Sequence, residues 1–296
     1  MHFSTLCLAP VVLSALADAT HTYRNYTSLT GYFLQDDPAT NASSFSFQAT
    51  NFGLINRTYS GQDGAQAQGT QWQRFAKEVT RLQHESPHSQ IKVLFMGRHG
   101  EGYHNAAQAY FGDPAWNCYY SFLNGNETVT WADPELTPTG SAQAQSNNAF
   151  WASEIKNQKI PTPESFYTSP LARCLETANL TFSGLDLMHP FIPTVKELFR
   201  EGISGHTCDR RRSKTYIRAK FPTYKIERGF AKTDPLFQPL RAETTIDQNI
   251  RSRKVLDDVF KHDDSTYISI TSHSGEIASL LTGKPAWCAH ALCHCR

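Results

Sequence analysis

The sequence contains no apolar run of the roughly 18 residues that a membrane-spanning helix requires. It also has no excess of either charge, because 28 Lys and Arg residues stand against 27 Asp and Glu residues. Nucleic-acid binding favours a strongly basic protein, so this balance argues against that function class. Charged residues are scarce at 19%, whereas aromatic residues reach 12%, a composition that argues against general disorder. We therefore expect a folded, soluble protein with neither a membrane nor a nucleic-acid partner.

The amino terminus has the features of a secretory signal peptide over residues 1–19. Residues 3–17 contain no acid or strong base, and Ala15, Ala17 and Ala19 provide the small-residue spacing that a signal peptidase accepts. The segment lacks an early Lys or Arg, so a buried first strand or helix is the alternative. Five Asn-x-Ser/Thr sequons predict a glycoprotein, and they begin at Asn25, Asn41, Asn56, Asn126 and Asn179. We expect the protein to be secreted, with a cytoplasmic location as the alternative.

Cysteine is too sparse to define a disulfide framework. Without the signal peptide six cysteines remain, and in a secretory context they permit many pairings: Cys118, Cys174, Cys208, Cys288, Cys293 and Cys295. The last three lie with His290 and His294 in residues 282–296, where a zinc site is the alternative to a loose tail. No second cluster stands at the spacing of a zinc finger, so we expect an atypical tail and no metal.

The order of the chain indicates one α/β domain after a polar arm. Residues 20–71 are rich in Ser, Thr, Gln and Gly, and an extended, irregular arm is expected there. Between residues 72 and 281 the apolar pattern alternates between strand and helix. The predicted strands are 92–96, 165–168, 191–198 and 267–270, and the predicted helices are 72–82, 137–155, with Thr137 as N-cap, 170–180 and 246–260. This alternation favours a three-layer α/β/α architecture with a mostly parallel central sheet.

Chemically suitable side chains follow the predicted strands. Arg98, His99, Arg173, Glu201 and His273 all come shortly after a strand end, where ligands bind in sheets of this kind. Two guanidinium groups offer planar pairs of donors that match phosphate oxygens. A neutral imidazole can attack phosphorus, a second can hydrogen-bond the transferring oxygens, and a carboxyl group can protonate the leaving oxygen. The pattern therefore predicts a pocket for phosphoryl transfer.

These residues belong to short motifs. The motifs are Arg98-His-Gly-Glu-Gly-Tyr-His-Asn105, Ser169-Pro-Leu-Ala-Arg-Cys-Leu-Glu-Thr-Ala178 and Ser272-His-Ser-Gly275. Together they resemble the histidine phosphatase, or phosphoglycerate-mutase-like, superfamily. The segment Arg200-Glu-Gly-Ile-Ser-Gly-His-Thr-Cys-Asp-Arg-Arg-Arg212 is similar to a eukaryotic phosphomutase-like branch. The resemblance covers residues 51–281 and implies a phosphoglycerate-mutase-like fold with the histidine phosphatase domain over residues 72–281.

The resemblance also implies roles for the phosphate-binding residues. His99 would become phosphorylated. Arg98, Arg173 and His273 would hold the phosphoryl group, and His273 would also take part in catalysis. Asn105 matches an Asn that often joins the phosphate pocket of the family. Together these residues would bind the phosphoryl group of a small substrate before, during and after its transfer to the protein.

The resemblance places the proton donor at Glu201, where the family pattern Leu-x-Glu ends. Two other carboxyl groups, those of Glu101 and Glu197, lie near enough in the sequence to compete for this role. The residue type alone does not separate the three, because each offers the same acid. For His104 a supporting role in the pocket and a purely structural role both stay open.

We therefore expect a phosphatase that hydrolyses phosphomonoesters through a phosphohistidine on His99, without a metal or other cofactor. A phosphomutase of the same chemistry is one alternative. Gly102 and His104 replace the small-residue and Trp pattern of true mutases, and this difference favours hydrolysis. A catalytically inactive, secreted protein that binds a phosphorylated ligand is the other alternative. The sequence leaves open which small phosphorylated substrate binds and what the oligomeric state is.

Two further features depart from a minimal enzyme. The basic run Arg210–Lys214, with Arg218 and Lys220, is either a solvated face or a rim that favours polyphosphorylated substrates.

Members of the family generally continue past the Ser-His-Ser-Gly helix into a further strand or strands. Residues 282–296 have neither strand nor helix periodicity, so we expect this tail to leave a sheet edge open near His273.

Overall fold

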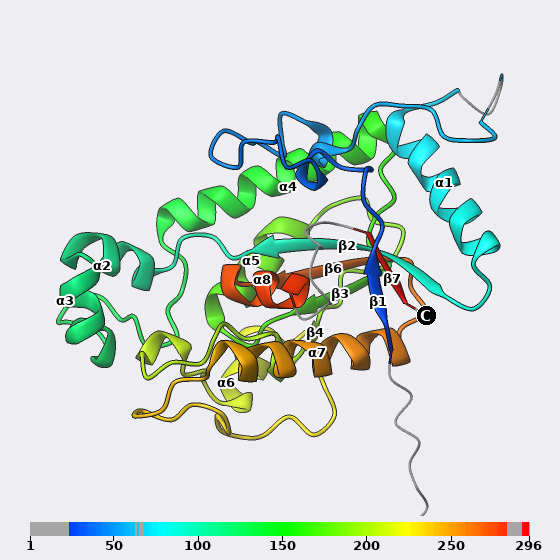
Figure 1. Ribbon diagram of the computed structural model, residues 1–296. Coiled ribbons are helices and arrows are strands. Elements are labelled where there is room, and N and C mark those ends of the chain that lie inside the picture. The colour runs from blue at the N-terminus through cyan, green and yellow to red at the C-terminus, as the bar shows by residue number, and fades with distance from the viewer. Residues whose placement is uncertain (1–23, 63, 65–67, 283–291, 296) are drawn as a thin grey trace, which may run out of the picture.

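One seven-stranded sheet organises the chain, in a computed structural model that describes residues 24–62, 64, 68–282 and 292–295 (Figure 1). Its strands are β1 (Tyr26–Ser28), β2 (Gln90–Arg98), β3 (Ser165–Thr168), β4 (Thr194–Val195), β5 (Lys225–Ile226), β6 (Tyr267–Ser272) and β7 (Leu292–Cys295). Their order across the sheet is β1-β7-β2-β6-β3-β4-β5. The strands from β2 to β5 in this order are parallel, and β7 is antiparallel to both of its neighbours. The predicted α/β class with a mostly parallel sheet is confirmed.

Helices cover both faces of this sheet. The α-helices are α1 (Gln71–Glu85), α2 (Tyr103–Phe111), α3 (Asp113–Cys118), α4 (Pro138–Gln158), α5 (Ala172–Phe182), α6 (Lys214–Lys220), α7 (Thr245–His262) and α8 (Ser274–Thr282). Short 3₁₀ helices are η1 (Leu34–Asp36), η2 (Asn51–Gly53), η4 (Tyr120–Phe122), η5 (Glu197–Phe199) and η6 (Thr207–Asp209). No helix in these residues is long and apolar enough to cross a membrane. Figure 1 shows α2 and α3 beyond the carboxyl ends of the central strands.

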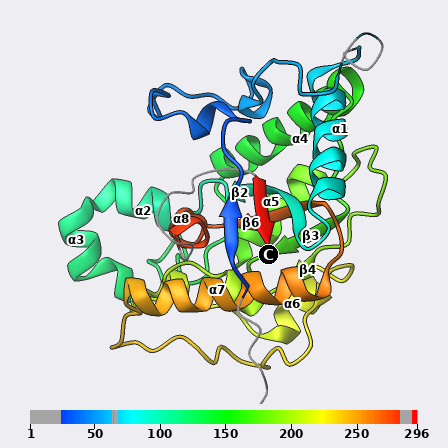
Figure 2. The ribbon, with the colours of Figure 1, turned by 45° about the vertical axis from the view of Figure 1, so that its right-hand side comes forward.

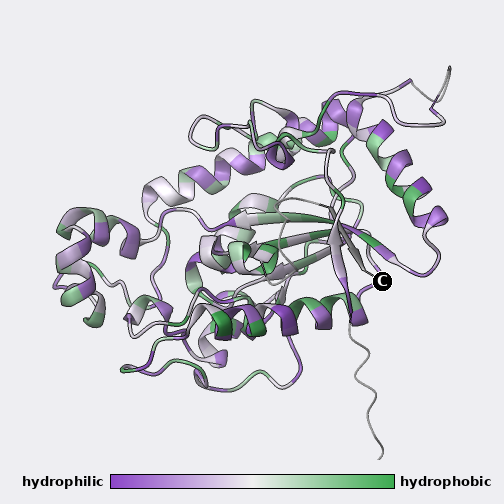
Figure 3. Cartoon of the chain, in the orientation of Figure 1, coloured by the Kyte–Doolittle hydropathy of each residue, from purple (hydrophilic) through white to green (hydrophobic). Residues whose placement is uncertain are grey.

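Two hydrophobic cores lie on opposite faces of the sheet. Val93 packs in one core with side chains of α1, α4 and α5. The next residue, Leu94, packs in the other core with side chains of α7 and α8. Successive residues of a strand point to opposite faces, so β2 is buried on both sides. Figure 3 shows hydrophilic residues on the covering helices, among them α1, α4 and α7, and Figure 2 shows α7 and α8 on the side away from α4.

The longer helices begin at the capping residues that the sequence contains. The Thr137 hydroxyl accepts a hydrogen bond from Gly140 N at 3.0 Å, and Pro138 is the first residue of α4, as predicted. Thr70 caps α1 by accepting from Gln73 N. The predicted helix over 246–260 is also present as α7. Its buried face contains Val255, Leu256, Val259 and Phe260, whereas Ile246 near its start is 72% exposed.

The third predicted strand is much shorter than expected. The apolar pattern over 191–198 predicted one continuous strand, but β4 contains only Thr194 and Val195. The chain then turns into η5. Val195 packs in the core between α5 and α6, whereas Phe199 packs in the core beneath α7. The apolar residues of this segment therefore pack in two different cores. Their sequence resembles that of one longer strand although they do not form one.

The carboxyl-terminal tail contributes a strand that its pattern did not predict. β7 lies between β1 and β2 and pairs with Gln90–Val93 of β2. Within the described chain, no strand pairs with Leu94–Arg98 of β2 on that side. The edge of β2, which was expected to be open, is thus covered by β7 over Gln90–Val93 and, among the described residues, not beyond. The zinc-site alternative involves Cys288 and His290, which lie outside the described residues.

The amino-terminal arm, which was predicted to be irregular, contains β1, η1 and η2 and contributes to the core. Phe33, Leu54 and Tyr59 are buried with residues of α1 and β2, and Phe33 forms a bridge to Leu54. Trp72 of α1 donates from its indole nitrogen to Asn51 Oδ1 at 2.6 Å. The arm therefore holds the sheet through aromatic packing as well as through β1, which pairs with β7. Residues 1–19, the predicted signal peptide, lie outside the described part of the chain.

A buried cluster of ion pairs fixes the chain after β4. Glu197 accepts hydrogen bonds from Arg211 Nε to both carboxylate oxygens, at 2.9 and 2.8 Å, and lies 3.2 Å from Arg200 Nη1. Asp234 binds Arg200 through two hydrogen bonds of 2.7 and 2.8 Å. Both guanidinium groups are almost completely buried. A buried cation needs a paired anion, so Glu197 is a structural partner of Arg200 and Arg211.

Glu197→Gln is therefore expected to destabilise the fold strongly. Removing this charge leaves two buried guanidinium groups undercompensated, and we expect a loss of about 3–5 kcal/mol in the free energy of unfolding. Urea unfolding measures this loss. The matched control is Glu85→Gln, which removes an exposed ion pair to Arg81 and should cost less than about 1 kcal/mol. Equal small losses in both variants would contradict the structural role of Glu197.

Candidate active site

Two histidines meet at the carboxyl ends of the neighbouring parallel strands β2 and β6. His99 follows β2 and its backbone N–H donates to Ser272 O at 3.0 Å, which continues the strand pairing by one residue. His273 follows β6 directly. The ring centroids of the two imidazoles are 5.1 Å apart. The sheet therefore brings the predicted nucleophile and the predicted phosphate-binding histidine together.

The orientation of the His99 ring is fixed by its own loop. Nδ1 lies 2.7 Å from Gly100 O, and because a carbonyl oxygen can only accept, Nδ1 carries the proton. The lone pair of the neutral ring is then on Nε2. Gly100 N donates to Thr177 Oγ1 at 3.0 Å, which ties the loop to α5. A Cβ at Gly100 would lie 2.4 Å from Gly140 O, so this loop needs glycine for its contact with α4.

His273 is held by residues of the second motif. Its Nε2 lies 2.8 Å from Ser169 Oγ and 3.3 Å from Cys174 Sγ. The Cys174 thiol donates to Ser272 O at 3.2 Å, and burial raises the pKa of this thiol far above its ordinary value. Cys174 is therefore a buried, unreactive neighbour rather than a nucleophile. Ser169, Cys174 and Thr177 were not predicted as site residues, although they stand within four residues of Arg173 in the motif.

A third imidazole, that of His104, lies beside the first two. Its ring centroid is 5.6 Å from that of His99, and the residue is only 9% exposed. Its Nδ1 is buried and has no hydrogen-bond partner within the described residues. A Cβ at Gly102 would lie 2.8 Å from this atom, so the loop packs directly against the ring. His104 therefore lines the histidine cluster. The sequence had left open whether this residue supports the pocket or is purely structural.

Arg173 supplies a buried positive charge next to these rings. The residue is 1% exposed, and its Nη1 donates to Cys208 O at 2.8 Å. Asp209 Oδ1 is 3.8 Å from Nη2, which is an ion pair but too long for a hydrogen bond. Within the described residues Nε has no partner. Asp133 accepts from Ala172 N at 2.8 Å and thereby anchors the first turn of α5, from which Arg173 extends.

The three imidazoles are neutral at physiological pH. Burial lowers the pKa of His99 well below its ordinary value, and the charges of Arg173 and Arg98 lower it further. Burial and Arg173 likewise lower the pKa of His104 and of His273. An uncharged ring retains the nitrogen lone pair that nucleophilic attack requires. The site thus combines positive guanidinium groups with uncharged imidazoles.

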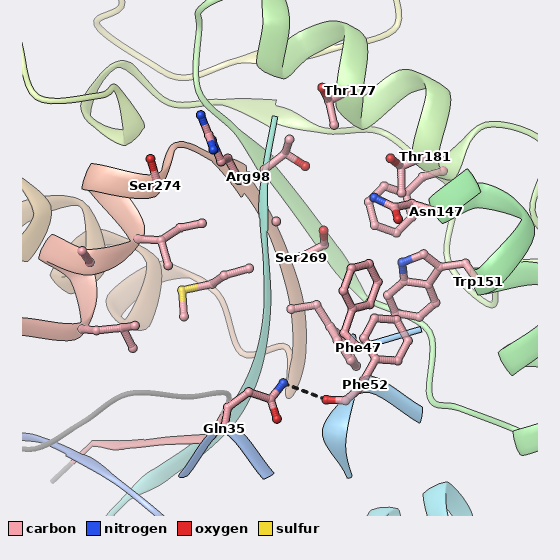
Figure 4. Close-up of a pocket in the computed structure, with 18 of the residues that line it drawn as sticks. Gln35, Phe47, Phe52, Arg98, Asn147, Trp151, Thr177, Thr181, Ser269 and Ser274 are labelled. Atoms are coloured by element: carbon pink, nitrogen blue, oxygen red, sulfur yellow. Dashed lines mark hydrogen bonds between the residues drawn. The ribbon is translucent and has the colours of Figure 1, made fainter. Parts of the chain in front are cut away.

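Arg98 lines an open hollow together with its neighbour His99. Both residues line a hollow of about 410 Å³ together with Gln143 and Asn147 of α4. Arg98 also lines an adjoining cavity of about 640 Å³ that contains Trp151 and several phenylalanines. In the view of Figure 4, Arg98 and Ser274 lie at one end of this larger cavity and Gln35 at the other. The Arg98 side chain is exposed, so this side of the site reaches solvent.

Asn105 has a defined local role at the start of α2. Its Oδ1 accepts a hydrogen bond from Gly102 N at 3.0 Å. This contact closes the first turn of α2 and holds the loop that packs on His104. Asn105 is half-buried at the edge of the cluster. The structure therefore places it beside the predicted phosphate pocket, with its carbonyl oxygen engaged by the protein.

Glu201 lies against the start of α8, immediately after His273. Gly275 N donates to Glu201 Oε2 at 3.3 Å, and Gly202 N donates to Oε1 at 3.0 Å. A Cβ at Gly275 would lie 2.2 Å from Oε1, so only glycine allows this carboxyl group to sit at the helix terminus. Glu201 is half-buried. Its carboxyl group is thus held at the start of α8, next to the residue that follows His273, and is partly open to solvent.

The two competing carboxyl groups have other partners. Glu101 Oε1 accepts from the Thr137 hydroxyl at 2.6 Å, and its backbone oxygen accepts from Thr137 N. Glu197 belongs to the buried ion cluster with Arg200 and Arg211. Glu201 instead binds backbone N–H groups, one of them that of Gly275, two residues after His273. The geometry therefore favours Glu201 among the three.

The basic run is buried only at Arg211, and Arg218 and Lys220 are exposed. Arg211 is buried against Glu197, and Arg212 stacks on the Tyr216 ring at 4.4 Å. Lys220 lies 3.2 Å from a Glu135 oxygen. Arg211, Arg212 and Lys220 are thus engaged by neighbouring side chains, whereas Arg218 lies on the solvated face. Within the described residues, no group of three or more His, Cys, Asp and Glu side chains is arranged to hold a metal ion.

Comparison with known proteins agrees with the motifs. The family model of the histidine phosphatase superfamily (branch 1) matches residues 94–286. A "Probable phosphoglycerate mutase" of Arthroderma benhamiae is 46% identical over 283 residues, which cover 94% of this chain and 84% of the relative. "Phosphomutase-like protein 3" of Candida albicans is 34% identical over 258 residues, which cover 86% of this chain and 73% of the relative.

Solved structures of low sequence identity are also similar to the chain. One is the alpha-ribazole phosphatase from Shigella flexneri, at 20% identity and a TM-score of 0.38, covering 65% of this chain and 81% of that one. Members of the matched superfamily are phosphatases or mutases that act on small phosphorylated substrates. The family model spans the loop of His99, the α5 motif of Arg173 and the strand end of His273. This chain belongs to branch 1 of the histidine phosphatase superfamily.

Proposed function

We propose that this protein is a metal-independent phosphatase that hydrolyses phosphomonoesters through a phosphohistidine on His99. The observation that carries the proposal is the hydrogen bond from His99 Nδ1 to Gly100 O. It leaves the lone pair on Nε2, in a ring whose pKa is lowered by burial and by the charge of Arg173. A neutral nitrogen beside a buried cation is suited to attack on an anionic phosphoryl group, which the cation attracts and aligns.

In the first step His99 Nε2 attacks phosphorus and the bond between phosphorus and the leaving oxygen breaks. Arg98 and Arg173 bind the non-bridging oxygens, and Arg173 Nε gains the acceptor that it lacks in the free site. His273, oriented by Ser169, donates to the same oxygens. Glu201 gives its proton to the leaving oxygen, so the alcohol departs neutral and the carboxylate remains.

In the second step water attacks phosphorus and the bond to His99 Nε2 breaks. The carboxylate of Glu201 takes a proton from this water and returns to its acid form. The products are inorganic phosphate and the neutral ring of His99. The exposed side chain of Arg98 keeps this side of the site in contact with solvent, from which the attacking water enters. Guanidinium groups supply the positive charge, so the mechanism needs no metal.

His99→Ala is expected to abolish turnover. The substitution removes the nucleophile, whereas Arg98 and Arg173 still bind phosphate. Incubation with a ³²P-labelled phosphomonoester and rapid denaturation should trap acid-labile label on the wild type and none on the variant. The matched control is His262→Ala, which removes an exposed histidine paired with Asp258 and should leave trapping and turnover intact.

Near-wild-type turnover by His99→Ala would contradict the proposed nucleophile. Phosphate binding without any turnover in the wild type would favour the inactive binding protein instead. Transfer of the label to a second alcohol rather than to water would favour a mutase. Loss of activity in excess EDTA, restored by one particular metal, would contradict the metal-independent mechanism.

Glu201→Gln is expected to slow alkyl phosphates far more than p-nitrophenyl phosphate. An alkoxide is a poor leaving group and depends on protonation, whereas p-nitrophenolate leaves without it. We expect a loss of about 10²–10⁴-fold in kcat/KM for an alkyl phosphate, the usual contribution of general acid catalysis. The control Glu101→Gln loosens a contact to Thr137 and should change both substrates equally. Equal losses on both substrates in Glu201→Gln would contradict its role as the acid.

We also propose that the protein is a secreted glycoprotein. The side chains of all five sequon asparagines are exposed and thus accessible to modification: Asn25, Asn41, Asn56, Asn126 and Asn179. Expression of the full chain in a eukaryotic host should release it into the medium, and peptide-N-glycosidase should lower its mass. A product that stays in the cytoplasm with its mass unchanged by the glycosidase would contradict this proposal.

A further inference from the structure

The main chain that carries Glu201 is held by Arg251, a buried residue of α7. Arg251 Nη1 donates to Leu198 O at 2.7 Å and to Arg200 O at 3.0 Å, and Nη2 donates to Glu201 O at 3.1 Å. One guanidinium group thus binds three backbone carbonyls within four consecutive residues. The first of these carbonyls lies in η5, and the other two belong to the stretch after it, to which the described backbone assigns neither strand nor helix.

A carboxylate fixes Arg251 and the same stretch from the other side. Glu243 accepts hydrogen bonds from Arg251 Nε and Nη2, both at 2.8 Å, in a bidentate ion pair. Glu243 Oε2 also accepts from Ile203 N at 3.1 Å, and Glu243 N donates to Ile203 O at 2.7 Å. Arg251 and Glu243 therefore hold the backbone on both sides of Glu201.

Arg251 also contacts α8, through the side chain of Glu276. Glu276 Oε2 accepts from Arg251 Nη1 at 3.1 Å and from Ser252 Oγ at 2.9 Å. Burial raises the pKa of Glu276 to about 8, although Arg251 opposes the shift. Glu276 is the residue after Gly275, against which the Glu201 carboxyl group packs. Arg251 thus connects the backbone of the acid to the helix terminus that receives its side chain.

We propose that Arg251 is the positioning residue of the general acid: its guanidinium group sets the distance between the Glu201 backbone and the start of α8, and so fixes the carboxyl group where it protonates the leaving oxygen. This inference rests on the proposed role of Glu201. Arg251 makes no contact with His99, Arg173 or His273 among the described hydrogen bonds and ion pairs, so its substitution leaves the nucleophile and the phosphate donors in place.

The first test measures Arg251→Met on two substrates. For an alkyl phosphate we expect kcat/KM to fall about 10²-fold, the scale of a misplacement of roughly 1 Å. For p-nitrophenyl phosphate the fall should be much smaller, because that substrate does not need the acid. The matched control is Arg253→Met on the same helix, which removes contacts to Asp257 and to the Tyr26 ring and should not separate the two substrates. Equal losses on both substrates in Arg251→Met would overturn the inference.

A double-mutant cycle tests whether Arg251 acts through Glu201. In the Glu201→Gln background the acid is already absent, so adding Arg251→Met should cause little further loss with the alkyl phosphate. Losses that multiply would show that Arg251 acts independently and would overturn the inference. The cycle also separates the two hypotheses, because a Glu201→Gln variant without any substrate preference would refute the acid itself.

Two milder variants keep the test valid if Arg251→Met does not fold. Arg251→Lys retains the charge but offers fewer donors, so we expect an intermediate fall with the alkyl phosphate. Glu243→Gln leaves Arg251 in place and weakens its bidentate ion pair, and the same substrate preference should appear. Wild-type levels of acid-labile phosphate trapped from p-nitrophenyl phosphate should persist in both variants. Loss of this trapping, or no difference between the substrates, would contradict a positioning role.

Discussion

The site depends on one electrostatic constraint, which is that Arg173 is buried without a carboxylate at hydrogen-bonding distance. Asp209 lies 3.8 Å away, and Nε has no partner within the described residues. Burial of a cation whose ion pair is this long is unfavourable, and it also makes a second positive charge nearby costly. Burial first, and then the charge of Arg173, lower the pKa of His99 and of His273, so both imidazoles stay neutral. A phosphoryl group would supply further negative charge and an acceptor for Nε together, so the free site is prepared for an anion.

Most of the long elements could be predicted from the sequence because they carry strong local signals. The capping residue Thr137 and the continuous apolar run of β2 each determine an element almost alone. The two-residue strands β4 and β5 are too short to show any periodicity, so pairing with neighbouring strands decides them. The same holds for β7, whose four residues show no alternation but pair with β1 and β2. Such elements depend on contacts between distant parts of the chain, which local patterns do not contain.

The candidate site was predictable to a similar degree. Placing residues at the ends of parallel strands identified His99 and His273, and the structure brings their rings together. The choice of Glu201 over the other two carboxyl groups could not come from residue type, because it depends on which partners each group meets after folding. Arg251 gave no signal at all, since it stands 50 residues from Glu201 and binds backbone atoms. Its role follows only from the arrangement of α7 against the loop of the acid.

The central claim is that His99 is a neutral imidazole with its proton on Nδ1 and its lone pair on Nε2. Nitrogen-15 NMR of the imidazole rings tests this directly, with the resonances of His99 assigned by their loss in a His99→Gln variant. At pH 6 the account predicts an uncharged ring with a protonated Nδ1 and an unprotonated Nε2, and no titration near pH 6.5, the ordinary value for histidine. A ring that titrates near pH 6.5, or one with its proton on Nε2, would contradict the account.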